Sequence, residues 1–125
     1  MKQVLFTLVI SMLALVAAAQ PKMEFKKLEH DFGVFKEDGG VAKVDFEFTN
    51  AGTAPLLLNN VNASCGCTTP TWTKEPVLPG KTGKISVAYD PRNRPGSFKK
   101  SISVYSNSNP SVVVLYISGN VSPRE

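Results

Sequence analysis

A strict alternation of apolar and polar residues in the middle of this chain constrains its fold more than any other feature. Residues 42–49 read Ala-Lys-Val-Asp-Phe-Glu-Phe-Thr, so every second side chain is apolar and the others are mostly charged. Because successive side chains of a β-strand point to opposite faces, this pattern predicts a strand with one face in a core and the other in water. The alternation recurs in residues 84–89 and in residues 98–104, where Lys100 interrupts the apolar row and predicts an edge position or an ammonium group that reaches solvent.

Turn-forming residues separate these segments at intervals of about ten residues, as a β-sandwich requires. Weaker strand patterns occupy residues 23–28 and 56–61, and no segment after residue 20 has the period of an amphipathic helix. Residues 112–117 are apolar on both faces, which indicates either a central strand or a strand with one face covered by a partner. We therefore predict an all-β, immunoglobulin-like antiparallel β-sandwich of about seven strands.

The N-terminal residues have the pattern of a secretory signal peptide. Lys2 precedes an almost wholly apolar run over residues 4–16, and residues 17–19 are all alanine. This run is shorter than the roughly 20 residues that a membrane-spanning helix needs. We predict a signal peptide over residues 1–19, cleavage between Ala19 and Gln20, and a single domain over residues 20–125 without a membrane span.

The charge pattern favours an ordinary solvated surface. The chain has a formal charge of +4, and its basic residues are scattered rather than gathered on one segment. A nucleic-acid-binding protein usually carries a concentrated basic face, so we expect no nucleic-acid partner.

The one chemically distinctive motif is Ser-Cys-Gly-Cys-Thr at residues 64–68, which holds both cysteines of the chain. On an extended chain the Cα atoms of Cys65 and Cys67 would lie about 6.5 Å apart, near the upper limit for a disulfide, and a bend at Gly66 would bring them closer. A bridge that closes so short a loop stabilises a fold by only about 1.6 kcal/mol. Three interpretations stay open: a local disulfide or two buried thiols, a site for copper(I) or zinc(II), and thiol–disulfide exchange.

Catalytic groups are scarce. His30 is the only histidine, and with Asp31 it is expected at a junction between a strand and a turn, before Phe32-Gly33. The acidic residues show no paired spacing of the kind used in acid–base catalysis. We therefore predict no enzymatic activity, no catalytic residues, no metal site and no cofactor.

Several short motifs resemble those of a family of short bacterial exported proteins known only as a domain of unknown function. The resemblance covers about residues 24–121, and its most specific element is the Ser-Cys-Gly-Cys-Thr segment. The other motifs are His30-Asp31-Phe32-Gly33, residues 48–56, Pro79-Gly80-Lys81, Tyr89-Asp90-Pro91, Gly96-Ser97-Phe98, residues 104–107 and residues 117–121. That family is similar to Hydin-type immunoglobulin-like domains and to the major sperm protein fold. The resemblance implies a seven-stranded immunoglobulin-like domain, and it implies no activity.

These observations lead to one expected function and one alternative. We expect an exported, non-enzymatic binding or structural module of the cell envelope, monomeric, located in the periplasm or outside the cell, with an envelope protein or glycan as its partner. The alternative is a thiol-based redox or soft-metal-binding protein that acts through Cys65 and Cys67.

Overall fold

The computed structural model describes residues 19–124, which form eight β-strands and no helix. Of the predicted signal peptide only Ala19 belongs to the described residues. In chain order the strands are β1 (Met23–Phe25), β2 (Glu29–Lys36), β3 (Ala42–Asn50), β4 (Leu58–Ala63), β5 (Thr68–Trp72), β6 (Thr82–Tyr89), β7 (Gly96–Ser106) and β8 (Val112–Ser122).

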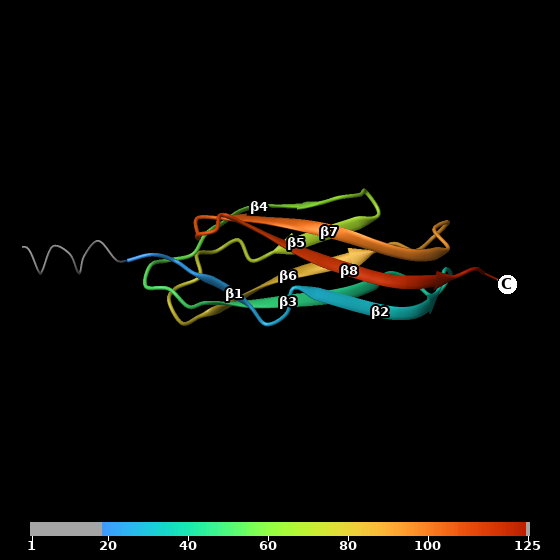
Figure 1. Ribbon diagram of the computed structural model, residues 1–125, viewed down its shortest axis with the longest axis horizontal. Helices are drawn as coiled ribbons and strands as arrows, with labels where there is room; N and C mark the ends of the chain where they lie inside the picture. The colour runs from blue at the N-terminus through green and yellow to red at the C-terminus, as the bar shows by residue number, and fades with distance from the viewer. Residues whose placement is uncertain (1–18, 125) are drawn as a thin grey trace, which may run out of the picture.

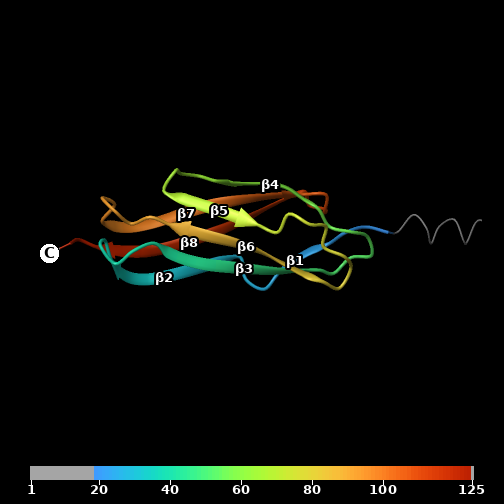
Figure 2. The ribbon, with the colours of Figure 1, turned by 180° about the vertical axis from the view of Figure 1, so that it is seen from behind.

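The strands form two four-stranded sheets that pack face to face (Figures 1 and 2). Sheet A has the order β1-β3-β6-β5, and sheet B has the order β2-β8-β7-β4. All neighbouring strands are antiparallel except β2 and β8, which run parallel. The predicted all-β sandwich is confirmed, with eight strands in place of about seven and one parallel pair. Both differences have one cause, because the N-terminal part of the chain contributes β1 to sheet A, crosses over, and then contributes β2 to sheet B.

The structure corrects the expectation for residues 30–33. These residues do not end a strand, since β2 runs through them from Glu29 to Lys36. The turn chemistry is present, but it forms a bulge inside the strand. Gly33 has a φ of 73°, its N–H donates to the Asp31 side chain at 2.8 Å, and the register with β8 shifts between Asp31 and Val34.

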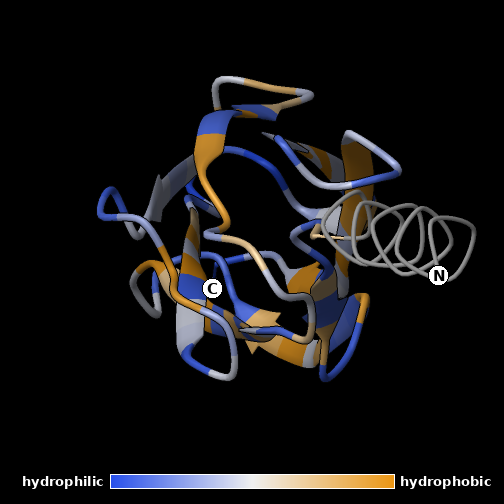
Figure 3. Cartoon of the chain, turned by 90° about the vertical axis from the view of Figure 1, so that its left-hand side faces the viewer, coloured by the Kyte–Doolittle hydropathy of each residue, from blue (hydrophilic) through white to orange (hydrophobic). Residues whose placement is uncertain are grey.

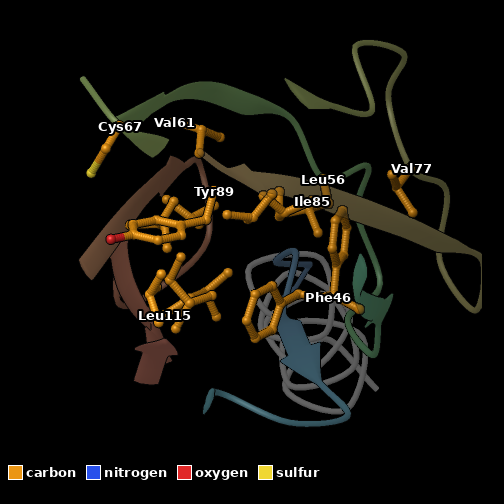
Figure 4. Packing of buried hydrophobic residues seen from close by; sticks show 14 residues of the cluster. Phe46, Leu56, Val61, Cys67, Val77, Ile85, Tyr89 and Leu115 are labelled. Carbon is orange, nitrogen blue, oxygen red and sulfur yellow. The ribbon is translucent and has the colours of Figure 1, made fainter. Parts of the chain in front are cut away.

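Alternating residues of both sheets meet in one hydrophobic core, as the sequence pattern predicted. Figure 3 shows hydrophobic and hydrophilic residues in alternating bands along the strands. Phe46 and Phe48 of β3 are fully buried, and Tyr89 of β6 lies across the interior toward sheet B with an exposure of 1% (Figure 4). The other buried apolar residues are Leu56, Val61, Cys67, Val77, Ile85, Val87, Ile102, Val104, Leu115, Ile117 and Val121. Lys100 lies on β7 beyond the end of β4, whose last pair with β7 joins Ala63 to Ile102. At Lys100, β7 is therefore locally an edge strand, as expected.

Candidate functional site

The Cys-Gly-Cys motif forms the turn between β4 and β5, and a disulfide joins Cys65 to Cys67. Their Cα atoms lie 5.3 Å apart, which is within the usual range for a disulfide and shorter than an extended chain allows. A hydrogen bond of 3.2 Å from the Thr68 N–H to the Cys65 carbonyl closes the turn. The expected bend is therefore present, but Gly66 does not have a left-handed φ, and a methyl group there would meet no atom within 4 Å. The bend does not depend on the conformational freedom of glycine.

The two cysteines differ in exposure. Cys67 is only 5% exposed and lies at the margin of the core, beyond Val61 and Tyr89 (Figure 4). Its carbonyl accepts a hydrogen bond of 2.9 Å from Asp90, and its N–H donates to the Cys65 sulfur at 3.0 Å. Cys65 is half-buried. A thiol that approaches from solvent therefore reaches the sulfur of Cys65 more readily than that of Cys67.

The structure does not bring His30 to the cysteines. His30 lies on β2 at one edge of sheet B, whereas the cysteines follow β4 at the opposite edge. Among residues 19–124 no group of three or more His, Cys, Asp or Glu side chains is placed to share a metal ion. Two sulfur atoms alone do not supply the four-ligand set of a structural zinc site.

His30 has its own local environment at the start of β2. The Lys27 ammonium lies 2.7 Å from His30 Nδ1, so this nitrogen accepts the hydrogen bond and the ring is neutral. Partial burial lowers the pKa of His30 below its ordinary value, and the charge of Lys27 lowers it further, while Asp31 acts in the opposite direction.

The outer face of sheet A is polar and charged. Lys26 pairs with Glu47, Lys84 lies 3.8 Å from Asp45, and Ser86 donates to Asp45 at 2.6 Å. A surface hollow of about 310 Å³ lies over β3, β5 and β6, lined by Lys43, Val44, Asp45, Thr69, Thr71, Ser86, Val87 and Ala88. These exposed ion pairs contribute little to stability, and we call this surface the charged face.

The outer face of sheet B carries a cluster of apolar side chains. Tyr105 of β7 pairs directly with Val112 of β8, and Val114 and Tyr116 continue the same row along β8. Tyr105, Val112 and Val114 are 37%, 39% and 36% exposed. Serines 101 and 103 lie beside them on β7. We call the surface formed by Tyr105, Val112, Val114 and Tyr116 the apolar face.

This cluster explains the doubly apolar pattern of residues 112–117. β8 lies between β2 and β7 only from Tyr116 onward, so the central position is confirmed for residues 116–117, while residues 112–115 pair with β7 alone. Leu115 and Ile117 face the core. Central placement does not account for the outward side chains, because Val112 and Val114 remain exposed within residues 19–124. The sequence indicated an apolar surface at residues 112–117, but it did not show which other residues lie beside it.

The other aromatic residues do not join the apolar face. Tyr89 is buried between the sheets, and Trp72 lies on β5 of sheet A with the Lys74 ammonium 3.1 Å from the centroid of its ring.

A buried carboxylate, which could not be recognised in the sequence, lies just after the end of β2. Glu37 is 6% exposed and accepts hydrogen bonds from the Asn93 N–H at 3.1 Å and from Arg124 Nε at 3.2 Å. Beside it, hydrogen bonds from Arg92 lower the pKa of Asp90. These groups border a hollow of about 530 Å³, but Glu37 is satisfied by its two donors and ties the C-terminal end of the chain to the domain.

The predicted cleavage site lies where the chain joins the sandwich. Ala19 and Gln20 are exposed, and the Gln20 carbonyl accepts a hydrogen bond of 2.8 Å from Thr53. No described helix could cross a membrane.

Comparison with protein families finds a match over most of the chain. Residues 23–121 match the family described as "Protein of unknown function (DUF1573)". This match confirms the expected membership of a family of unknown function. No curated protein is similar enough to this chain to count as a match.

Several solved structures share the fold. A protein of unknown function from Porphyromonas gingivalis W83 is 24% identical, with a TM-score of 0.71 over 82% of this chain and 48% of that one. The secreted serine protease VesC from Vibrio cholerae is 15% identical, with a TM-score of 0.60 over 86% of this chain and 24% of that one. The YadV chaperone is 14% identical, with a TM-score of 0.54 over 83% of this chain and 53% of that one. This chain thus spans about half or less of each neighbour, and such low identities establish the fold alone.

Proposed function

The chain belongs to the DUF1573 family of proteins of unknown function, and we propose that it acts as an exported, non-enzymatic binding module of the cell envelope. Its apolar face would contact the partner. The observation that carries this proposal is the contrast between the two outer faces of the sandwich. The charged face of sheet A carries ion pairs between exposed side chains, whereas sheet B presents Tyr105, Val112 and Val114 together, each more than a third exposed.

Exposed apolar side chains that gather on one sheet are the usual mark of an interaction surface, whereas single exposed ones are ordinary. Tyrosine supports the proposal further, because its ring gives a large contact area and its hydroxyl can bond a polar partner. The motifs imply a likeness to Hydin-type and major sperm protein-like domains, and this likeness is consistent with a domain that binds a partner.

Export is the second part of the proposal, and it rests on the signal-peptide pattern of residues 1–19. The mature protein would begin at Gln20 and reside in the periplasm or outside the cell as a monomer. Intact mass spectrometry of the protein from its own cells tests this directly. A mass that includes the residues before Gln20 would contradict export by signal cleavage.

Differential capture tests the binding surface. The bait is the mature protein at micromolar concentration in an envelope extract, and the variants are Val114→Lys on the apolar face and Thr71→Lys on the charged face. We expect a defined partner that wild type and Thr71→Lys retain and that Val114→Lys recovers about tenfold less, because a buried lysine would lose its hydration. A partner retained equally by both variants would remove the apolar face from the proposal.

The disulfide supports a second candidate function, thiol–disulfide exchange. The observation in its favour is a bridge between near neighbours in which Cys65 is less buried than Cys67. One thiolate of a partner dithiol would attack the Cys65 sulfur and release Cys67 as a thiolate, which forms a mixed disulfide between the partner and Cys65. The second thiolate of the partner would then cleave this mixed disulfide, so the partner leaves with its own disulfide and both cysteines become thiols. Titration in glutathione redox buffers tests this, with alkylated thiols counted by mass. If the disulfide stays oxidised in millimolar dithiothreitol, this candidate function is wrong. If the reduced protein binds stoichiometric copper or zinc, a metal-binding function is favoured instead.

A further inference from the structure

β8 has an unpaired edge over its first four residues. β2 pairs with β8 only from the level of Glu29 and Tyr116 onward, and β1 belongs to the other sheet. Among residues 19–124 no strand pairs with residues 112–115 of β8 on that side. Figures 1 and 2 both show β8 continuing past the start of β2 toward the end of the sandwich where the described chain begins.

The backbone of this edge has hydrogen-bonding groups that point outward in the plane of the sheet. The N–H of Tyr116 donates to the Leu28 carbonyl at 2.9 Å, so even-numbered residues of β8 present their backbone groups to the β2 side. By the same alternation, Val112 and Val114 direct their N–H and C=O groups to the open side. Val113 and Leu115 face β7, where they pair with Val104 and Ile102.

The side chains around this edge are apolar. Val112 and Val114 flank it on the outer surface with Tyr105 beside them, and Leu28, which is 49% exposed, lies where β2 begins. Residues 112–115 contain no charged residue and no proline.

The other sheet edges carry features that discourage pairing with a foreign strand. β1 is only three residues long and contains Glu24, β2 has the bulge after Asp31, and β5 contains Pro70. On β4 the Asn60 side chain accepts a hydrogen bond from the Val61 N–H at 2.9 Å and the register shifts. Among the described edges, only the open part of β8 combines free backbone groups with apolar, β-branched side chains.

We infer that residues 112–115 bind an extended peptide segment of another exported protein, which adds to sheet B as a short strand in line with β2. This inference rests on the proposed function and specifies the partner. Backbone hydrogen bonds from Val112 and Val114 would hold the segment, and alternate apolar side chains of the segment would contact Val114 and Leu28. The ligand is therefore an uncharged stretch with β-branched or aromatic residues at every second position.

A second copy of this chain is a poorer occupant. Two copies that paired through this edge would bring together only four residues of strand from each, about 13 Å in length. A stable dimer interface typically contains about 20–30 residues on each side. A short strand from a flexible or extended segment needs no such area.

The test uses a capped synthetic peptide of about eight residues in which valine and threonine alternate, with lysines at one end for solubility. Binding to the mature protein is measured by fluorescence anisotropy. The decisive variant is Val114→Pro, which removes the N–H on the open side and places the proline ring there. The substitution removes no hydrogen bond to β7, because the Val114 N–H points away from that strand and proline is tolerated at such positions of an edge strand. The matched variant is Val114→Thr, which keeps the backbone donor and the β-branched shape.

We expect Val114→Pro to bind the peptide at least about tenfold more weakly than wild type, and Val114→Thr to remain within about threefold. Circular dichroism of each variant checks that the sandwich is intact. If Val114→Pro does not fold, the wild-type protein is tested with the same peptide N-methylated at alternate residues, which should also bind about tenfold more weakly.

Equal binding of the plain and N-methylated peptides, or of wild type and Val114→Pro, would overturn the inference. So would a wild-type dimer in solution that Val114→Pro converts to a monomer, because a second copy would then close the edge. Failure of this inference can be distinguished from failure of the proposed function. If the captured envelope partner is lost with Val114→Lys but kept with Val114→Pro, the apolar face binds it through side chains and strand addition is wrong.

Discussion

Gly83 of β6 lies opposite Phe48 of β3, and the phenylalanine ring fills the space where a side chain would stand. A Cβ atom built on Gly83 would lie 2.5 Å from Cζ of Phe48. Phe48 is fully buried, so its ring cannot turn aside into solvent. The close approach of the backbone to this ring therefore requires glycine at position 83.

Gly83→Ala is expected to destabilise the fold by about 1–3 kcal/mol, because the added methyl group overpacks the core. Urea denaturation followed by tryptophan fluorescence measures the free energy of unfolding. Gly66→Ala is the matched control, since a methyl group there meets no atom within 4 Å. Equal effects of the two substitutions would contradict this description of the core.

Asn50 provides a second test, because its buried side chain holds four backbone groups. It accepts from the N–H groups of Lys22 and Gly52 at 3.2 and 2.9 Å, and it donates to the carbonyls of Ala54 and Val77 at 2.8 Å each. Asn50→Ala leaves these groups without their partner and is expected to cost at least about 2 kcal/mol of unfolding free energy. The exposed Asn62→Ala should change it by less than about 0.5 kcal/mol.

The bridge between Cys65 and Cys67 is expected to contribute little to stability. Its three-residue loop limits the chain-entropy contribution to about 1.6 kcal/mol, so Cys65→Ala should cost no more than that. Cys67→Ala should cost more, since it also removes a side chain that is 5% exposed and packed at the margin of the core. A loss of about 3 kcal/mol in Cys65→Ala would show that the bridge braces the fold.

His30 should titrate below its ordinary pKa of 6.5, as NMR of its ring protons will measure. Partial burial is the main cause and the charge of Lys27 the second, so Lys27→Ala should raise the pKa without restoring it fully. A lowered pKa means that the unfolded chain binds the proton more readily than the folded one. Stability should therefore fall as the pH drops from 6.5 through the folded pKa. A pKa of His30 above 6.5 would contradict the contact with Lys27.

The sequence predicted the strands whose alternation is regular and missed those where another feature interrupts it. β3 and β6 follow from period two alone. β2 was obscured because the Phe32-Gly33 bulge reads as a turn, and β5 because Pro70 and three threonines carry a weak pattern. No local sequence pattern shows that the N-terminal region is divided between the two sheets. Alternation indicates that one face of a strand is buried, but it does not indicate to which sheet the strand belongs.

The candidate site was predicted in the same uneven way. The proximity of Cys65 and Cys67 was predicted from their separation by a single residue. The apolar face was visible only as residues 112–117 with no polar side, because the position of Tyr105 beside Val112 depends on the register of β7 with β8. The contact of Glu37 with Arg124, 87 residues apart, depends on the finished fold.

Site-specific photocrosslinking in living cells tests most directly whether sheet B is the binding surface. A benzophenone amino acid is placed at position 105 in place of Tyr105 and, in a separate strain, at position 71 in place of Thr71. The expected result is one discrete crosslinked product from position 105 and none from position 71, because the partner would cover the apolar face and leave the charged face in water. No product from position 105, or the same product from both positions, would contradict it.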